Sequence, residues 1–198
     1  YGTPGRSEWK WWEGHQHFSS VSVSHLKRYG NTDVALGGVA LKDDGYRRLN
    51  DEQFLRLNMR LEHQNRHISG LYYGLGMLGG LSDKRDFLLW EDAQKGALKQ
   101  NPETASRLDG KFIYLDPFVG FSREGIDSHL WQMRLHGHDN RYPQTIQNNA
   151  SSRLMFSEYQ YSRELKRSMQ FIGGVVYQLS DIRSHFYADH RAINMAAY

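Results

Sequence analysis

The chain of 198 residues contains no cysteine and only four prolines. The missing thiol excludes disulfides, zinc–cysteine sites, iron–sulfur ligation and thiol catalysis. No apolar run reaches the roughly 18 residues that a transmembrane helix requires. The sequence also has no Pro-rich linker, no charge block and no internal repeat. We therefore expect a single domain over residues 1–198, with a Trp-rich N-terminal segment at 1–16.

Charge is balanced rather than concentrated. There are 25 Lys and Arg against 22 Asp and Glu, for a net charge of +3. Because the basic residues form no stripe, we expect no nucleic-acid partner. Aromatic residues make up 13% of the chain, which is too many for a disordered polypeptide. The chain is expected to fold.

The most informative pattern is the alternation of apolar and polar residues, which predicts β-strands. In the segment 53–64 every second residue is apolar, and the segment 67–81 repeats the pattern. Their connection at 65–67 is short, so the two segments predict a hairpin. Further candidate strands are 111–122, 128–138, 152–163 and 168–179, with weaker ones at 17–26, 33–42 and 185–197. These make nine, and the segment 8–13 is a possible tenth.

One segment has a helical pattern: residues 87–98, inside a long loop predicted over 82–109. The predicted fold class is therefore all-β. We expect an antiparallel up-and-down meander β-barrel of about 8–10 strands, with one short helix in the long loop.

The connections differ in length in a regular way. Short ones around 65–67, 123–127 and 164–167 alternate with long ones at 42–52, 82–109 and 139–151. This layout resembles the bacterial outer-membrane β-barrel proteins, which have short periplasmic turns and longer outer loops. The resemblance covers residues 17–198 and is one of pattern, without a specific family.

The resemblance implies a porin-like integral protein of the Gram-negative cell envelope, located in the outer membrane and surrounded by membrane lipid or lipopolysaccharide. Strands of about ten to twelve residues suit the 9–11 that cross a bilayer. One alternative stays open: a soluble secreted or periplasmic β-barrel or sandwich whose apolar face packs a core. Such a module would bind carbohydrate or protein through its loops.

In a membrane barrel the apolar residues of each strand face lipid and the polar residues face a lumen. The expected lipid-facing residues are Leu55, Leu57, Met59, Leu61, Leu71, Leu75, Val119, Met133 and Val175. The expected lumen-lining residues are Arg56, Arg60, Glu62, Tyr72, Asp116, Arg134 and Glu158. Arginines in this set favour anionic solutes or glycan, unless they are engaged in ion pairs with Glu62, Asp116 and Glu158. A cluster of three tryptophans is expected at the membrane–water interface: Trp9, Trp11 and Trp12.

Two segments are faintly similar to outer-membrane lipid hydrolases. His17 and Ser19 have the His-x-Ser spacing of lipid A deacylases, and His136 lies where such enzymes place a catalytic histidine. A hydrolase needs a nucleophile, a base and an orienting group at one rim, and the sequence supplies two at most.

The histidine pairs His15/His17 and His136/His138 have the spacing that puts both rings on one face of a strand. Neither pair has a third metal ligand nearby, so we expect no metal and no cofactor. The leading hypothesis is a non-enzymatic barrel with a structural, assembly or small-channel role, either alone or as part of a larger complex of envelope proteins. A soluble binding module ranks second and a lipid hydrolase third.

Overall fold

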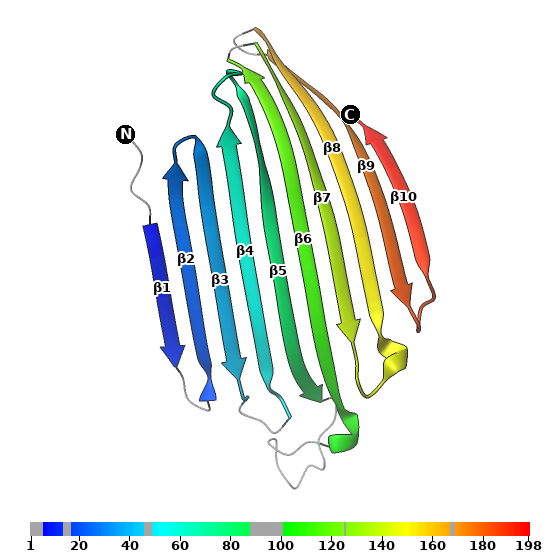
Figure 1. The fold of residues 1–198 in the computed structure, drawn as a ribbon. Helices are drawn as coiled ribbons and strands as arrows, with labels where there is room; N and C mark the ends of the chain where they lie inside the picture. Colours follow the sequence, from blue (N-terminus) through cyan, green and yellow to red (C-terminus); the bar gives the residue numbers. More distant parts are fainter. Residues whose placement is uncertain (1–5, 14–16, 46–48, 88–100, 125, 167–168) are drawn as a thin grey trace.

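The computed structural model describes residues 6–13, 17–45, 49–87, 101–124, 126–166 and 169–198. Ten strands form one antiparallel sheet in the order in which they occur in the chain (Figure 1). They are β1 (Arg6–Glu13), β2 (Ser19–Tyr29), β3 (Thr32–Asp43), β4 (Glu52–Gln64), β5 (Leu71–Phe87), β6 (Ala105–Arg123), β7 (Asp127–Arg141), β8 (Ala150–Lys166), β9 (Met169–Ser184) and β10 (His190–Ala197). Two short 3₁₀ turns, η2 (Pro102–Thr104) and η3 (Ile146–Asn148), precede β6 and β8. The prediction of an all-β antiparallel meander is confirmed.

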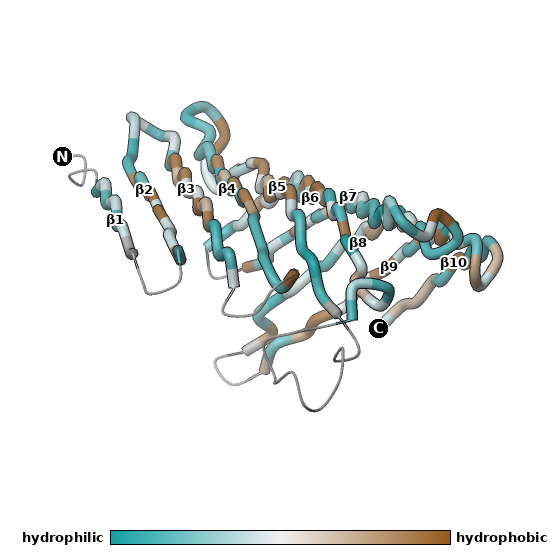
Figure 2. The backbone as a smooth tube through the Cα atoms, turned by 90° about the horizontal axis from the view of Figure 1, so that it is seen from below, coloured by the Kyte–Doolittle hydropathy of each residue, from teal (hydrophilic) through white to brown (hydrophobic). Residues whose placement is uncertain are grey.

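The sheet remains open, so the closed barrel that the sequence predicts is not what the structure shows. Among the described residues β1 pairs only with β2, and β10 pairs only with β9. Figure 2 shows the sheet bent across its strands, with β1 and β10 at its two separate edges. Closure requires the first and last strands to meet with a fixed register stagger, and the bend of these ten strands does not bring the two edges together.

One predicted boundary is wrong and one open alternative is decided. The segment 82–109 is not a loop throughout, because β5 and β6 pair continuously from Leu81 and Lys111 out to Phe87 and Ala105. Apolar residues do not alternate with polar ones in these extensions, which is why the pattern gave no strand there. The possible tenth strand at 8–13 is confirmed, since β1 brings the number of strands to ten and pairs with β2 along its whole length. The helix predicted at 87–98 falls on residues 88–100, outside the described residues, and Phe87 ends β5.

The fold has no hydrophobic core in its described part. No apolar side chain there is buried, and the buried residues are Ser20, Gly110, Gly120 and Asp127. Globular domains bury the apolar side of a sheet against a second layer, and this sheet has no second layer among the described residues. The apolar side of the sheet is therefore left uncovered by the described residues.

Glycines on one side of the sheet are packed under bulky neighbours. A Cβ at Gly74 would lie 2.5 Å from a Phe118 ring carbon, and one at Gly120 would lie 2.2 Å from the Tyr72 ring. Similar contacts involve Gly80 with Phe112 and Gly174 with Tyr198. Large rings laid over glycines on adjacent strands compensate for the weak packing of glycine in a sheet.

Candidate functional site

The strand register assigns every described side chain to one of two faces. Residues directly opposite each other in an antiparallel pair point to the same side. One such row crosses eight strands, from β3 to β10, and contains only apolar residues: Leu36, Met59, Met77, Leu115, Leu135, Met155, Leu179 and Ile193. We call the side to which this row belongs the apolar face and the opposite side the polar face.

All nine residues expected to face lipid lie on the apolar face. Trp9 and Trp11 of β1 join them, with exposed fractions of 75% and 58%. The backbone of Trp12 pairs with Ser20 of β2. The register thus brings the expected lipid-facing residues together, and the medium that they contact remains a prediction.

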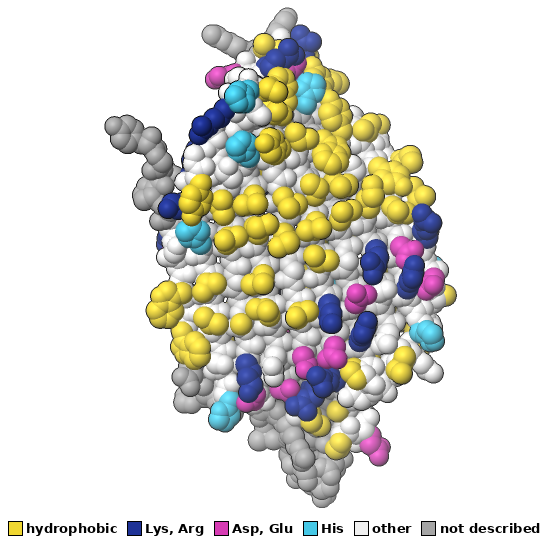
Figure 3. All heavy atoms as spheres, viewed as in Figure 1, with side chains coloured by type: hydrophobic (Ala, Val, Ile, Leu, Met, Phe, Trp, Pro, Cys, Tyr) yellow, Lys and Arg dark blue, Asp and Glu magenta, His cyan; other side chains and the backbone are white. Residues whose placement is uncertain are grey.

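The apolar residues form a belt that runs obliquely to the hydrogen-bonded rows. On β5 the last apolar residue before a charge is Leu81, and on β9 it is Leu179. Leu179 lies in the row of Met77, four residues away from Leu81 along β5. The rise is about 3.3 Å per residue and the spacing about 4.8 Å per strand. The border of the belt therefore makes an angle of about 35° with the hydrogen-bonded rows, so the strands tilt by about 35° from the perpendicular to the belt. Figure 3 shows the boundary between apolar and charged side chains crossing the face diagonally.

Beyond the belt, toward the long connections, the same face becomes charged. We call these residues the charged belt: Asp83, Arg107, Asp109, Lys111, Asp139, Arg141, Arg153, Asp181, Arg183 and Arg191. The alternation did not indicate these residues, because several lie in the parts of β5 and β6 within 82–109, the segment predicted as a loop. The charged belt marks a sharp change of polarity along single strands.

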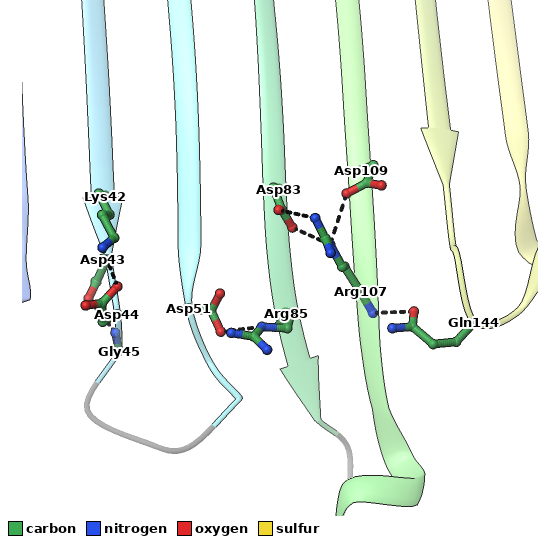
Figure 4. A network of polar contacts seen from close by, with 10 residues as sticks. All are labelled: Lys42, Asp43, Asp44, Gly45, Asp51, Asp83, Arg85, Arg107, Asp109 and Gln144. Atoms are coloured by element: carbon green, nitrogen blue, oxygen red, sulfur yellow. Dashed lines mark hydrogen bonds and ion pairs between the residues drawn. The ribbon is translucent and has the colours of Figure 1, made fainter.

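Part of the charged belt is paired internally. The guanidinium of Arg107 donates to Asp83 at 3.0 and 2.6 Å and lies 3.3 Å from Asp109 (Figure 4). The hydrogen bond with Asp83 and the charges of both carboxylates raise the pKa of Arg107. Arg183 pairs with Asp181 at 3.2 Å. In the described part of the chain no ion pair joins Lys111, Asp139 or Arg153 to an opposite charge.

At the other border of the apolar belt, aromatic side chains gather near the short turns. They are Tyr73, Phe121, His129, Trp131, Tyr159, Tyr161 and Phe171. Several also form polar contacts: the Trp131 indole N–H donates to Ser157 at 3.0 Å, and His129 Nδ1 lies 2.7 Å from the Tyr159 hydroxyl. Aromatic rings with one polar end suit a border between an apolar phase and water.

The polar face carries all seven residues expected to line a lumen. Arg134 donates to both carboxylate oxygens of Asp116, at 2.7 and 2.8 Å. Arg60 pairs with Glu62 at 3.3 Å and stacks on the Phe118 ring at 4.9 Å. Two of the three expected ion-pair acceptors are thus engaged with arginine.

The third acceptor, Glu158, binds neutral donors instead. It accepts hydrogen bonds from Gln132 at 2.6 Å and from the Tyr198 hydroxyl at 2.8 Å. A cavity of about 590 Å³ lies beside this network and is lined by Arg60, Tyr72, Asp116, Gln132 and Arg134, among others. On the polar face Glu62, Asp116 and Glu158 therefore all have hydrogen-bond or ion-pair partners.

The three weak catalytic candidates are not brought together. Ser19 opens β2 on the apolar face, whereas His136 lies on the polar face of β7 and stacks on Tyr114 with 4.2 Å between ring centres. His17 precedes β2 in a left-handed conformation, with φ of 61°. A nucleophile and a base on opposite faces of a sheet cannot act on one bond. The register therefore separates His136 from Ser19, whereas the pair of His17 and Ser19 stays a prediction.

Metal ligands do not converge either. The described residues contain no group of three or more His, Cys, Asp or Glu side chains that would hold an ion. His136 and His138 are neighbours, with 6.2 Å between ring centres, but have no third ligand among the described residues. His15 of the other pair lies outside the described residues.

Comparison of the chain with protein-family models, with curated proteins and with solved structures finds no match. The described part of the chain contains no helix long and apolar enough to cross a membrane.

Proposed function

We propose that this chain forms the membrane-embedded wall of an outer-membrane β-barrel in the Gram-negative cell envelope, with a structural role in a larger assembly. The observation that carries the proposal is the apolar belt. It continues over all ten strands, is left uncovered by the described residues, and lies opposite a polar face. A soluble protein would bury such a surface.

The dimensions of the belt support a bilayer as the covering medium. On β5 it extends from Leu71 to Leu81, ten residue steps, or about 33 Å along the strand. A tilt of about 35° reduces this to a height of about 27 Å, close to the roughly 25 Å apolar band of transmembrane barrels. The tilt itself lies at the lower end of the 35–45° range that barrel strands adopt. The aromatic border on one side and the charged belt on the other fit the two membrane interfaces.

The open edges support the assembly role. Both edge strands have eight residues, and both carry the belt, through Trp9 and Trp11 on β1 and through Ile193 and Met195 on β10. A sheet edge within hydrocarbon would leave its N–H and C=O groups without hydrogen bonds, at several kcal/mol each. Strands from a further polypeptide segment or envelope protein are therefore proposed to pair with β1 and β10 and close the barrel. A small-channel role ranks second, because the ion pairs on the polar face suit a filled lumen better than an open one.

The first test is extraction of membranes with alkaline carbonate, followed by flotation of the purified chain with phospholipid vesicles. We expect the protein to remain with the membrane and to float. Release into the supernatant would support the alternative of a soluble binding module.

The second test concerns the role within the membrane. Native mass spectrometry in mild detergent is expected to detect complexes with additional protein mass, and a clean monomer would count against the assembly role. Planar-bilayer recordings address the channel: a large stable conductance whose anion preference falls in Arg56→Gln would favour it.

A further inference from the structure

A groove of about 400 Å³ crosses the apolar face at the border of the charged belt. Its apolar walls include Leu57, Leu81 and Ile113, and its end is lined by Lys111, Asp139 and Arg153. The groove therefore joins an apolar channel to a charged end, on the face that we propose to contact lipid.

Two glycines make the groove hollow. Gly79 of β5 and Gly137 of β7 lie in one hydrogen-bonded row, on either side of Ile113. The heavy atom nearest to a Cβ placed at Gly79 would be the Phe112 carbonyl oxygen, at 3.6 Å. For a Cβ at Gly137 it would be a methyl carbon of Ile113, also at 3.6 Å. The space above both positions is open, in contrast to the crowded glycines of the polar face.

The charges at the end of the groove form no ion pair with any residue that the structure describes. In the strand register Lys111 lies directly opposite Asp139, and in the next row on the same face Arg153 lies directly opposite Gly137. In the described part of the chain neither cation forms an ion pair. With Asp139 counted, the three groups carry one net positive charge, which favours an anion.

We propose that this groove binds an acyl lipid with an anionic phosphate headgroup, with one acyl chain along Gly79 and Gly137 and the phosphate between Lys111 and Arg153. The inference rests on the proposed membrane location. Shape and charge agree: the groove is lined by apolar side chains along its length, and Lys111 and Arg153, which form no ion pair within the described residues, line its charged end. Arg can bind the phosphate bidentately and Lys as a point charge.

The test uses the full chain in phosphatidylcholine vesicles that contain a trace of spin-labelled phosphatidylglycerol or, separately, spin-labelled phosphatidylcholine. Electron paramagnetic resonance measures the motionally restricted fraction of each label and so the relative association constant of the two lipids. We expect phosphatidylglycerol to be preferred. Lys111→Gln and Arg153→Gln should each reduce the preference about fivefold, the contribution of one cation near a membrane surface. Asp139→Asn should raise it by a similar factor.

Two further variants separate a site from general surface attraction. Gly79→Leu fills the groove without changing charge and should remove most of the preference. Arg60→Gln makes the same charge change on the polar face and should leave the preference unchanged. A preference that survives in the Lys111→Gln/Arg153→Gln double variant, or that falls equally in Arg60→Gln, would overturn the inference. Failure of the protein to float with vesicles would instead refute the proposed membrane location, and the lipid site with it.

Discussion

Arginine placed at different heights of the apolar belt is expected to destabilise the protein by amounts that depend on depth. Met77 lies four residue steps inside the last apolar residue of β5, Leu81, which is about 13 Å along the strand and about 11 Å along the membrane normal at a tilt of about 35°. Near the midplane of a bilayer an outward-facing arginine costs about 2–4 kcal/mol, whereas near an interface it costs about 0–1 kcal/mol. Met77→Arg should therefore cost at least about 2 kcal/mol and Leu81→Arg at most about 1 kcal/mol.

The measurement is equilibrium unfolding by urea from phospholipid vesicles, followed by the fluorescence of the five tryptophans. Gln178→Arg is the matched control, because Gln178 lies on the polar face of β9 and its arginine would remain in water. We expect the control to cost less than about 1 kcal/mol. Equal costs for Met77→Arg and Leu81→Arg, or a control as costly as Met77→Arg, would refute the assignment of the two faces.

The remaining predictions concern packing and acid stability. Gly74→Ala should lower the free energy of unfolding by about 1–3 kcal/mol, because its Cβ would lie 2.1 Å from the Leu61 carbonyl oxygen. Gly79→Ala on the same strand should change the free energy of unfolding by less than about 0.5 kcal/mol. The urea midpoints of the two variants test this difference. At the short-turn end, outside the apolar belt, the hydrogen bond and charge of Arg123 lower the pKa of Asp127 below its usual 3.8. Asp127 should therefore contribute stability that is complete above pH 3.8 and lost as the pH falls through its lower folded pKa. Urea midpoints measured across that range should fall more steeply for the natural chain than for Asp127→Asn.

The alternation on β4 and β5 allowed the sequence to predict these strands and the side of each residue between Leu55 and Leu75. A period of two is a local property, and it needs no knowledge of neighbouring strands. The same reasoning missed the extension from Ser82 to Phe87, because residues beyond the belt are polar on both faces and no longer alternate. Strand ends that lie beyond the apolar belt therefore show no alternation from which a strand could be predicted.

The groove could not be predicted for a different reason. Gly79 and Gly137 are far apart in the sequence, and only the combined register of β5, β6 and β7 places them in one row. The oblique border of the belt has the same origin, since it depends on how residues on β5 and β9 align through three intervening strands. The alternation predicted ion pairs between the arginines and the acidic residues of the polar face as a group, whereas the particular pair of Arg134 with Asp116 follows only from the packing of adjacent strands β6 and β7.

In the proposed membrane setting, the slant of the belt also determines which residues lie above one another along the membrane normal. The strands tilt by about 35° from the perpendicular to the belt. A line drawn along the membrane normal therefore does not follow any one strand. Over the height of the bilayer it passes from one strand to strands further along the sheet. A lipid standing upright against this wall would thus contact residues from several hairpins at once. If the sheet changed its tilt, all the residues that contact this lipid would change together. The tilt of the strands would then determine which lipid the proposed assembly binds.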